Sequence, residues 1–216
     1  MRVPARTLAL VTACLLVAVA PAAAQPTEPP GPFAVDVRGA FSSVGRSDDL
    51  AAPRGLRAGE LPKRVLGLDV GAHVYPVRGR VTLGLGASLL VIGGTQAPGE
   101  PEEGATDVGI VSGEYAVRAV VPQLSLNFGS SRGWSYLGAG LGFSQLKAGP
   151  SESELSYSPQ LLTLNLGGGA RWFVSEHVAF TFDGRYYRIG AKDLDSGYVG
   201  NPMVSMFVLS AGLSFK

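Results

Sequence analysis

The sequence predicts an all-β protein, an eight-stranded antiparallel up-and-down transmembrane β-barrel. Three observations favour this fold: apolar side chains alternate with period two in eight segments, the connections alternate between short and long, and charge is low while apolar content is high. The chain has 216 residues, of which 46% are hydrophobic and 16% charged, with 30 glycines. An ordinary soluble domain carries roughly 25% charged residues, and a length near 200 fits one barrel better than several domains. The formal charge of +1 argues against a nucleic-acid-binding protein, which needs a basic excess.

The first 24 residues have the pattern of a cleaved signal peptide. Arg2 and Arg6 precede an apolar stretch at 8–20, and the small residues 22–24 offer a cleavage site. An uncleaved anchor is one alternative, although the stretch is shorter than the ~20 residues of a spanning helix; a lipoprotein signal at Cys14 is another. Cleavage removes the single cysteine and two arginines, so Lys plus Arg falls from 18 to 16 against 17 acidic residues. The exported protein then has a net charge of −1 and no disulfide.

After the signal peptide, residues 25–32 form a Pro-rich leader that we expect to be extended and outside the core. Residues 33–216 are expected to form the barrel domain. Its predicted strands, each near the 9–11 residues of a tilted membrane strand, are 33–42, 66–74, 81–91, 120–128, 137–144, 162–172, 180–187 and 207–215. Pro122 lies inside the fourth strand and predicts a bulge there, because proline cannot donate to the ladder.

The connections between these segments alternate in length. Tight turns are expected at 76–80, 129–133 and 174–177. Longer polar segments are expected at 43–64, 93–115, 145–159 and 190–202. An even number of meandering strands with short turns at one end and long loops at the other is the layout of an outer-membrane barrel, with both termini on the periplasmic side.

The composition of the two strand faces predicts which face meets lipid. The face opposite the apolar one consists mostly of Gly, Ser, Thr and Asn with a few charges of both signs, whereas a soluble barrel would expose many Lys and Glu side chains there. Glycines suit a crowded interior, and we expect that interior to be closed, polar and filled by side chains. Aromatic residues gather near strand ends, as in the two girdles of a membrane barrel: Phe33, Phe128, Trp172, Phe180 and Phe215 toward the turns, and Phe41, Phe143, Tyr186 and Phe207 toward the loops.

The alternating strands, the four long loops, the signal peptide and the final stretch 207–215 together resemble the small outer-membrane β-barrel family, similar to the membrane domain of outer membrane protein A. The resemblance implies a location in the outer membrane of a Gram-negative cell envelope. The last strand also resembles the signal read by the barrel assembly machinery, carried here by Phe207, Leu209, Leu213 and Phe215. Lys216 departs from that pattern because it makes the aromatic residue penultimate.

Two groups of side chains are candidate sites. On the inward face, three acids and three bases are expected to form an ion-pair network that fills the lumen, because buried charge is tolerated only when paired: Asp36, Arg38, Asp69, Arg171, Asp183 and Arg185. A gated polar path is the alternative role for these residues. On the lipid-facing side near the loops, Arg118 and Arg188 are expected to contact phosphates of lipopolysaccharide, with simple interfacial snorkelling as the alternative.

No pattern indicates catalysis or a bound cofactor. His73 and His177 are the two histidines, and neither is expected near other metal ligands or in a Ser–His–acid arrangement. We therefore expect a non-enzymatic, monomeric outer-membrane protein without metal or cofactor, with a structural or surface-interaction role through four long extracellular loops. A narrow channel for small solutes is the main alternative, and a soluble secreted ligand-binding barrel is a further one.

Overall fold

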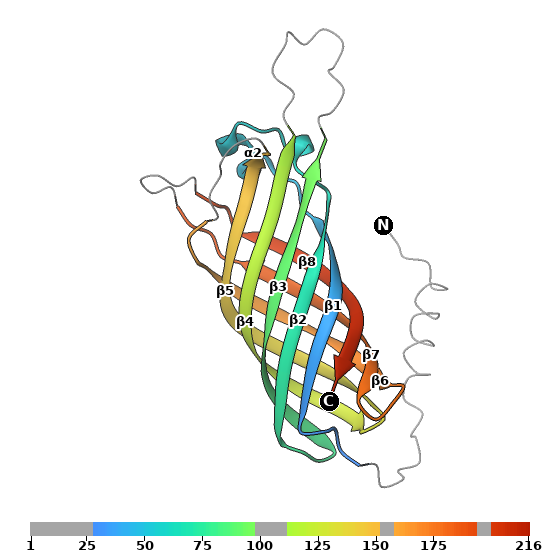
Figure 1. The fold of residues 1–216 in the computed structure, drawn as a ribbon. Coiled ribbons are helices and arrows are strands. Elements are labelled where there is room, and N and C mark those ends of the chain that lie inside the picture. Colours follow the sequence, from blue (N-terminus) through green and yellow to red (C-terminus); the bar gives the residue numbers. More distant parts are fainter. Residues whose placement is uncertain (1–27, 98–111, 152–157, 194–199) are drawn as a thin grey trace, which may run out of the picture.

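The protein is a closed barrel of eight antiparallel strands in which each strand pairs with its sequence neighbours and the last pairs with the first (Figure 1). The structure is a computed structural model that describes residues 28–97, 112–151, 158–193 and 200–216; the predicted signal peptide lies outside these residues. The strands are β1 (Phe33–Val44), β2 (Arg64–Val77), β3 (Val81–Gln96), β4 (Gly113–Ser130), β5 (Gly133–Pro150), β6 (Leu161–Phe173), β7 (Val178–Ile189) and β8 (Val204–Phe215). The predicted fold class and strand order are confirmed. In the described part of the chain, no helix has the length and apolarity needed to cross a membrane.

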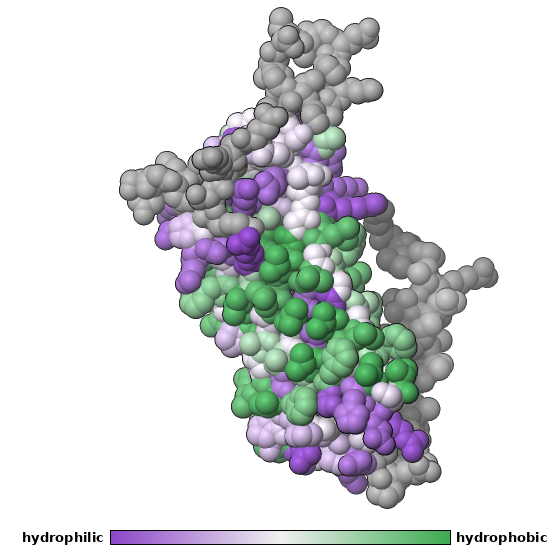
Figure 2. Space-filling view, viewed as in Figure 1, coloured by the Kyte–Doolittle hydropathy of each residue, from purple (hydrophilic) through white to green (hydrophobic). Residues whose placement is uncertain are grey.

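Side-chain alternation separates a lipid-like exterior from a filled interior. Along β1, outward and inward residues alternate without a break, from exposed Phe33 to buried Val44. All nine aromatic residues expected at the strand ends lie outside, between 37% and 59% exposed. On the face seen in Figure 2, an apolar band lies between two polar ends. A continuous apolar belt of this kind is stable in contact with hydrocarbon and not with water.

Three strands run further toward the loop end than the alternation predicted. β3, β4 and β5 continue through 92–96, 113–119 and 145–150, beyond the predicted strands and into the loops expected at 93–115 and 145–159. None of the outward positions there carries a large apolar side chain, and Glu114 and Lys147 form an ion pair at 2.9 Å between β4 and β5. Because these strand ends pass beyond the apolar belt, they lose the alternation on which the prediction depended.

The bulge predicted at Pro122 is wrong. Pairs Val120–Phe143 and Gln123–Gly140 keep one register on either side of the proline, so only the ladder toward β5 is interrupted where the N–H is missing. On its other side Pro122 pairs in register with Ala87 of β3. The irregular register occurs instead in β2 between Val74 and Val77, next to the turn, where a bulge disturbs fewer ladder bonds.

The described end of the leader crosses the turn end of the barrel. The Glu28 carbonyl accepts a bond from the Ser131 N–H at 2.7 Å, the Pro32 carbonyl accepts one from the Tyr75 N–H at 2.8 Å, and Pro30 is buried. The Lys216 ammonium donates to the Ser131 carbonyl at 2.5 Å. Partial burial lowers the pKa of Lys216, and the carboxylates of Glu28 and Glu176 oppose this shift. Backbone hydrogen bonds therefore tie residues 28–32 to the barrel rim.

Candidate functional site

The six charged side chains expected in the lumen all lie there, and none is more than 2% exposed. They come from four strands and carry equal numbers of opposite charges: Asp36 and Arg38 on β1, Asp69 on β2, Arg171 on β6, Asp183 and Arg185 on β7. The structure thus brings together residues separated by more than a hundred positions, because closure of β8 onto β1 places β1, β2, β6 and β7 around one space. We call these six residues the lumen network.

The shortest ion pair across the lumen joins strands that are not neighbours in the sheet. Arg171 donates from Nε to Asp36 Oδ1 at 2.8 Å and from Nη2 to Asp36 Oδ2 at 2.5 Å. Two parallel bonds of this kind fix both orientation and distance. This pair therefore braces β6 against β1 across the interior.

Arg38 is the centre of the second part of the network. Its guanidinium lies 2.8 Å from Asp69 Oδ2 through Nη2 and bonds the same oxygen through Nε at 3.1 Å. Ser210 donates to that carboxylate at 3.1 Å. Arg38 Nη1 also donates to the Tyr136 hydroxyl at 3.0 Å. One arginine therefore holds together side chains of β1, β2 and β5.

Tyr136 is the residue that the sequence reasoning missed. Its hydroxyl accepts from Arg38 and donates to Asp183 Oδ2 at 2.6 Å, and the Arg171 guanidinium lies 4.3 Å from the centre of its ring. Gly169 makes this position possible, since a Cβ there would come within 3.0 Å of the tyrosine ring and hydroxyl. The signal was present: Tyr136 has the inward parity of β5, whose next inward residues are glycines.

Arg185 completes the network from the same strand as its partner. It donates from Nε and Nη2 to the two oxygens of Asp183 at 2.8 and 3.1 Å. All three carboxylates are thus paired with arginine, and buried charge is tolerable under that condition. The lumen network as a whole braces strands against one another, because Arg171–Asp36 links β6 to β1 and Arg38–Asp69 links β1 to β2.

The loop end of the lumen holds a large apolar cluster, so the expectation of a polar interior throughout is wrong. Leu50, Ala51, Leu56 and Leu61, all at most 4% exposed, lie in the β1–β2 connection, which forms α2 (Asp48–Ala51) and the short helices η1 (Ala52–Arg54) and η2 (Ala58–Glu60). They belong to a buried cluster with inward residues of the strands, among them Val65, Leu90, Ile92, Tyr115, Val117, Leu146, Tyr187, Ile189 and Met206. Several of these positions lie in strand ends that had been expected to be loop. Figure 1 shows α2 at the loop end of the barrel.

The two arginines expected at the lipid interface both point outward, but the structure does not bring them together. Arg118 lies on β4 and Arg188 on β7, with β5 and β6 between them. Both are exposed. Arg188 Nε lies 2.9 Å from Met203 Sδ.

The two histidines lie apart. His73 is buried in the lumen, with Nδ1 3.9 Å from Asp36 Oδ2, and His177 is exposed in the β6–β7 turn. Among the residues that the structure describes, no three His, Cys, Asp or Glu side chains are grouped so as to hold a metal ion.

The outward residues of β8 lie on the barrel exterior. Phe207, Leu209, Leu213 and Phe215 are between 38% and 53% exposed. They lie on the outward face of β8, which is part of the apolar belt, so in the folded barrel they are positioned to contact lipid.

Taken together, an apolar belt, a meander of eight strands and a lumen occupied by side chains define a small membrane β-barrel. The chain belongs to the family of the outer membrane protein beta-barrel domain, whose model matches residues 11–215. This membership places it in the outer membrane and removes the alternative of a soluble secreted barrel.

The structure of neisserial surface protein A shows the same fold, and a structure of Ail is also similar. Neisserial surface protein A is 16% identical with a TM-score of 0.54, covering 86% of this chain and 97% of its own. Ail, the attachment invasion locus protein of Yersinia pestis, crystallised with the heparin analogue sucrose octasulfate, is 14% identical with a TM-score of 0.48, covering 85% and 96%. Comparison with curated proteins found no match.

Proposed function

We propose that this protein is a non-enzymatic, monomeric outer-membrane barrel with a structural or surface-interaction role, exerted through loops at the end where α2 lies. The observation that carries the proposal is the filled lumen. The lumen network occupies one part of it, and the apolar cluster with the β1–β2 connection occupies the other. An eight-stranded barrel has an interior just wide enough for side chains, so its exposed loops are the part available to partners.

Conductance separates this role from that of a narrow channel. Purified barrel in planar bilayers is expected to give no single-channel steps, and liposomes that contain it are expected not to swell in small sugars or amino acids. A trimeric porin in the same lipid serves as the positive control. Reproducible steps that scale with protein amount would establish the channel and overturn the closed-barrel role.

Cysteine labelling tests which end faces outward. The signal-cleaved chain contains no cysteine, so single substitutions report cleanly. Gly59 in the β1–β2 connection and Gly79 in the β2–β3 turn are both exposed, and a Cβ at either meets nothing closer than 3.9 Å. A membrane-impermeant maleimide is expected to label Gly59→Cys in intact cells and to label Gly79→Cys only after the envelope is opened. The reverse pattern would overturn the surface role of the loops.

We further propose two classes of partner. Arg118 and Arg188 contact phosphates of lipopolysaccharide, for which arginine geometry is suited. Exchanging both for alanine is expected to remove the stabilisation that added lipopolysaccharide gives in thermal melts, and full retention would contradict the proposal.

The β8 residues Phe207, Leu209, Leu213 and Phe215 present alternate apolar side chains to the barrel assembly machinery before the barrel closes.

A further inference from the structure

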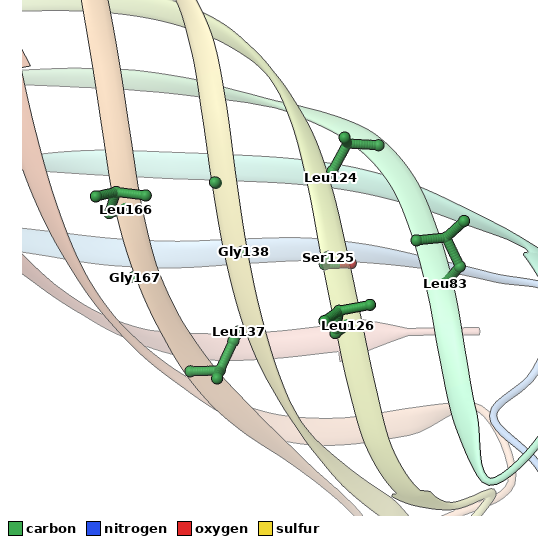
Figure 3. Close-up of a pocket in the computed structure, with 9 residues that line it drawn as sticks. Leu83, Leu124, Ser125, Leu126, Leu137, Gly138, Leu166 and Gly167 are labelled. Atoms are coloured by element: carbon green, nitrogen blue, oxygen red, sulfur yellow. The ribbon is translucent and has the colours of Figure 1, made fainter.

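Two hollows follow each other along the outside of β4 and β5. The one nearer the loop end, the upper hollow, has a volume of about 380 Å³, and its lining includes Val120 and Pro122 of β4 and Leu141 and Phe143 of β5. The next, the lower hollow, has a volume of about 520 Å³, and its lining includes Leu83, Leu124, Leu126, Leu137 and Leu166 (Figure 3). Toward the turn end, the lining passes from Pro122 to Leu124 on β4 and from Leu141 to Ala139 on β5, so the two hollows lie two residues apart on each strand. The two hollows therefore form a track along one strand pair, which we call the β4–β5 groove.

Small residues and a gap in the ladder account for the hollow shape. The floor of the upper hollow includes Gly142, which has no side chain, and the strand pairing is interrupted between Val120–Phe143 and Gln123–Gly140. In the lower hollow, Ala139 is paired with Leu124 on one side and Leu166 on the other. A small residue between two large ones leaves a trough in the surface.

The upper hollow changes from apolar to polar at its loop end. There its lining includes Arg118, Gln145 and Gln160, and Arg118 is the cross-strand partner of Gln145. Gln145 Nε2 donates to the Ser158 carbonyl at 3.3 Å, which holds the amide in place. Arginine has five N–H donors in a planar fork, so it can serve a protein partner and a phosphate together.

The dimensions match one lipid chain of the outer leaflet. From Arg118 to Pro122 the strand rises about 13 Å at ~3.3 Å per residue. With a tilt of roughly 40°, this covers about 10 Å of depth, close to half of an apolar belt about 25 Å tall. The lower hollow then begins near the middle of the membrane and can take the end of a longer chain.

We propose that the β4–β5 groove binds one acyl chain of a phosphorylated outer-leaflet lipid, with its phosphate held by Arg118, Gln145 and Gln160. The inference rests on the proposed function and sharpens it, because it adds an acyl-chain site beside Arg118 to the phosphate contacts proposed for Arg118 and Arg188.

Native mass spectrometry of the barrel released from micelles tests this site. The probes are diphosphorylated lipid A and the same lipid after enzymatic dephosphorylation. Two variants attack the site: Arg118→Gln removes the cation, and Val120→Trp fills the upper hollow from the outside. Arg64→Gln and Leu68→Trp are the matched controls, since Arg64 and Leu68 are exposed outward residues of β2. Heat-modifiable gel mobility verifies that every variant is folded.

The wild-type barrel is expected to retain one phosphorylated lipid through activation that strips the others. Both site variants should lose this occupancy by about tenfold or more, as expected for the loss of charge-assisted bonds or of the space itself. The two controls should match the wild type, and dephosphorylation should reproduce the Arg118→Gln result. Unchanged retention in Val120→Trp would overturn the groove even if Arg118→Gln binds weakly, which would leave the simpler phosphate contact in place. An equal loss in Arg64→Gln would overturn the site at Arg118, while outward labelling of Gly59→Cys would still support the surface role.

Discussion

Replacing Arg38 by alanine should destabilise the barrel more than replacing Arg185, although both arginines are buried in the lumen network. Arg38 joins three strands through its bonds to Asp69 and Tyr136. Arg185 bonds to Asp183, which lies two residues away on the same strand. Asp183 also keeps its bond from Tyr136 when Arg185 is lost.

The contacts set the size of each effect. Without Arg38, the three carboxylates face two arginines, and Asp69 keeps the bond from Ser210. Breaking a buried pair by removing one partner costs about 3–5 kcal/mol. For Arg185 we expect a smaller cost, about 1–3 kcal/mol, because Asp183 keeps the bond from Tyr136 and a second cation, Arg38, whose Nη1 lies 3.9 Å from Asp183 Oδ2. With an m-value of about 2 kcal/mol per molar urea, the midpoints should fall by about 2 M and about 1 M.

Equilibrium unfolding in urea from lipid vesicles, followed by the fluorescence of Trp134 and Trp172, measures both shifts. The exposed turn residue Arg132 supplies the control, since Arg132→Ala should change stability by no more than about 0.5 kcal/mol. The double variant Arg38→Ala/Asp69→Ala should lose less than the sum of its single variants, because contacting charges couple by about 0.5–3 kcal/mol. Unchanged midpoints in both arginine variants would refute the brace, and a larger loss for Arg185 would refute the ranking.

Three other predictions follow from particular contacts. Gly169→Val should prevent formation of the compact, heat-modifiable species on gels, because a Cβ there meets the Phe182 carbonyl and the Tyr136 ring, whereas Gly59→Val should fold normally. Leu50→Asp with Leu61→Asp should release the β1–β2 connection, seen as faster proteolysis near 47–61 with the barrel still resistant, since a buried charge without a partner is unfavourable; equal cleavage in the wild type would contradict its docking. Phe215→Ala should slow assembly of the barrel in cells relative to Phe33→Ala, and equal rates would remove the assembly role of that aromatic residue.

The sequence was sufficient to predict the features that depend on the alternation of side chains with period two. Parity placed Asp36 and Arg38 inside and Phe33 and Phe41 outside, because a strand must alternate and the apolar belt must be continuous. It could not give the strand ends, where the outward side chains become polar once the strand leaves the belt. It also could not show that Leu50 and Leu61 are buried, since a few apolar residues scattered through a charged loop have no periodicity and their burial depends on the barrel mouth beneath them.

The lumen was expected to be one polar space, and the missed strand ends explain why that picture was incomplete. The inward residues of those ends, such as Ile92 and Val117, are apolar and form a layer above the lumen network. At the turn end, Trp134 stacks on Phe173 with ring centres 5.0 Å apart and meets Tyr75 edge to face at 6.0 Å.

The lumen network and the apolar layer close the barrel by different interactions. Charged side chains hold the strands together where they can pair, and apolar side chains exclude water where nothing charged could be satisfied. Moving the β1–β2 connection aside leaves the arginine pairs across the lumen intact, and shortening one arginine leaves the apolar layer intact. A water path therefore needs both layers to open, which is why the closed barrel is the role that the interior supports.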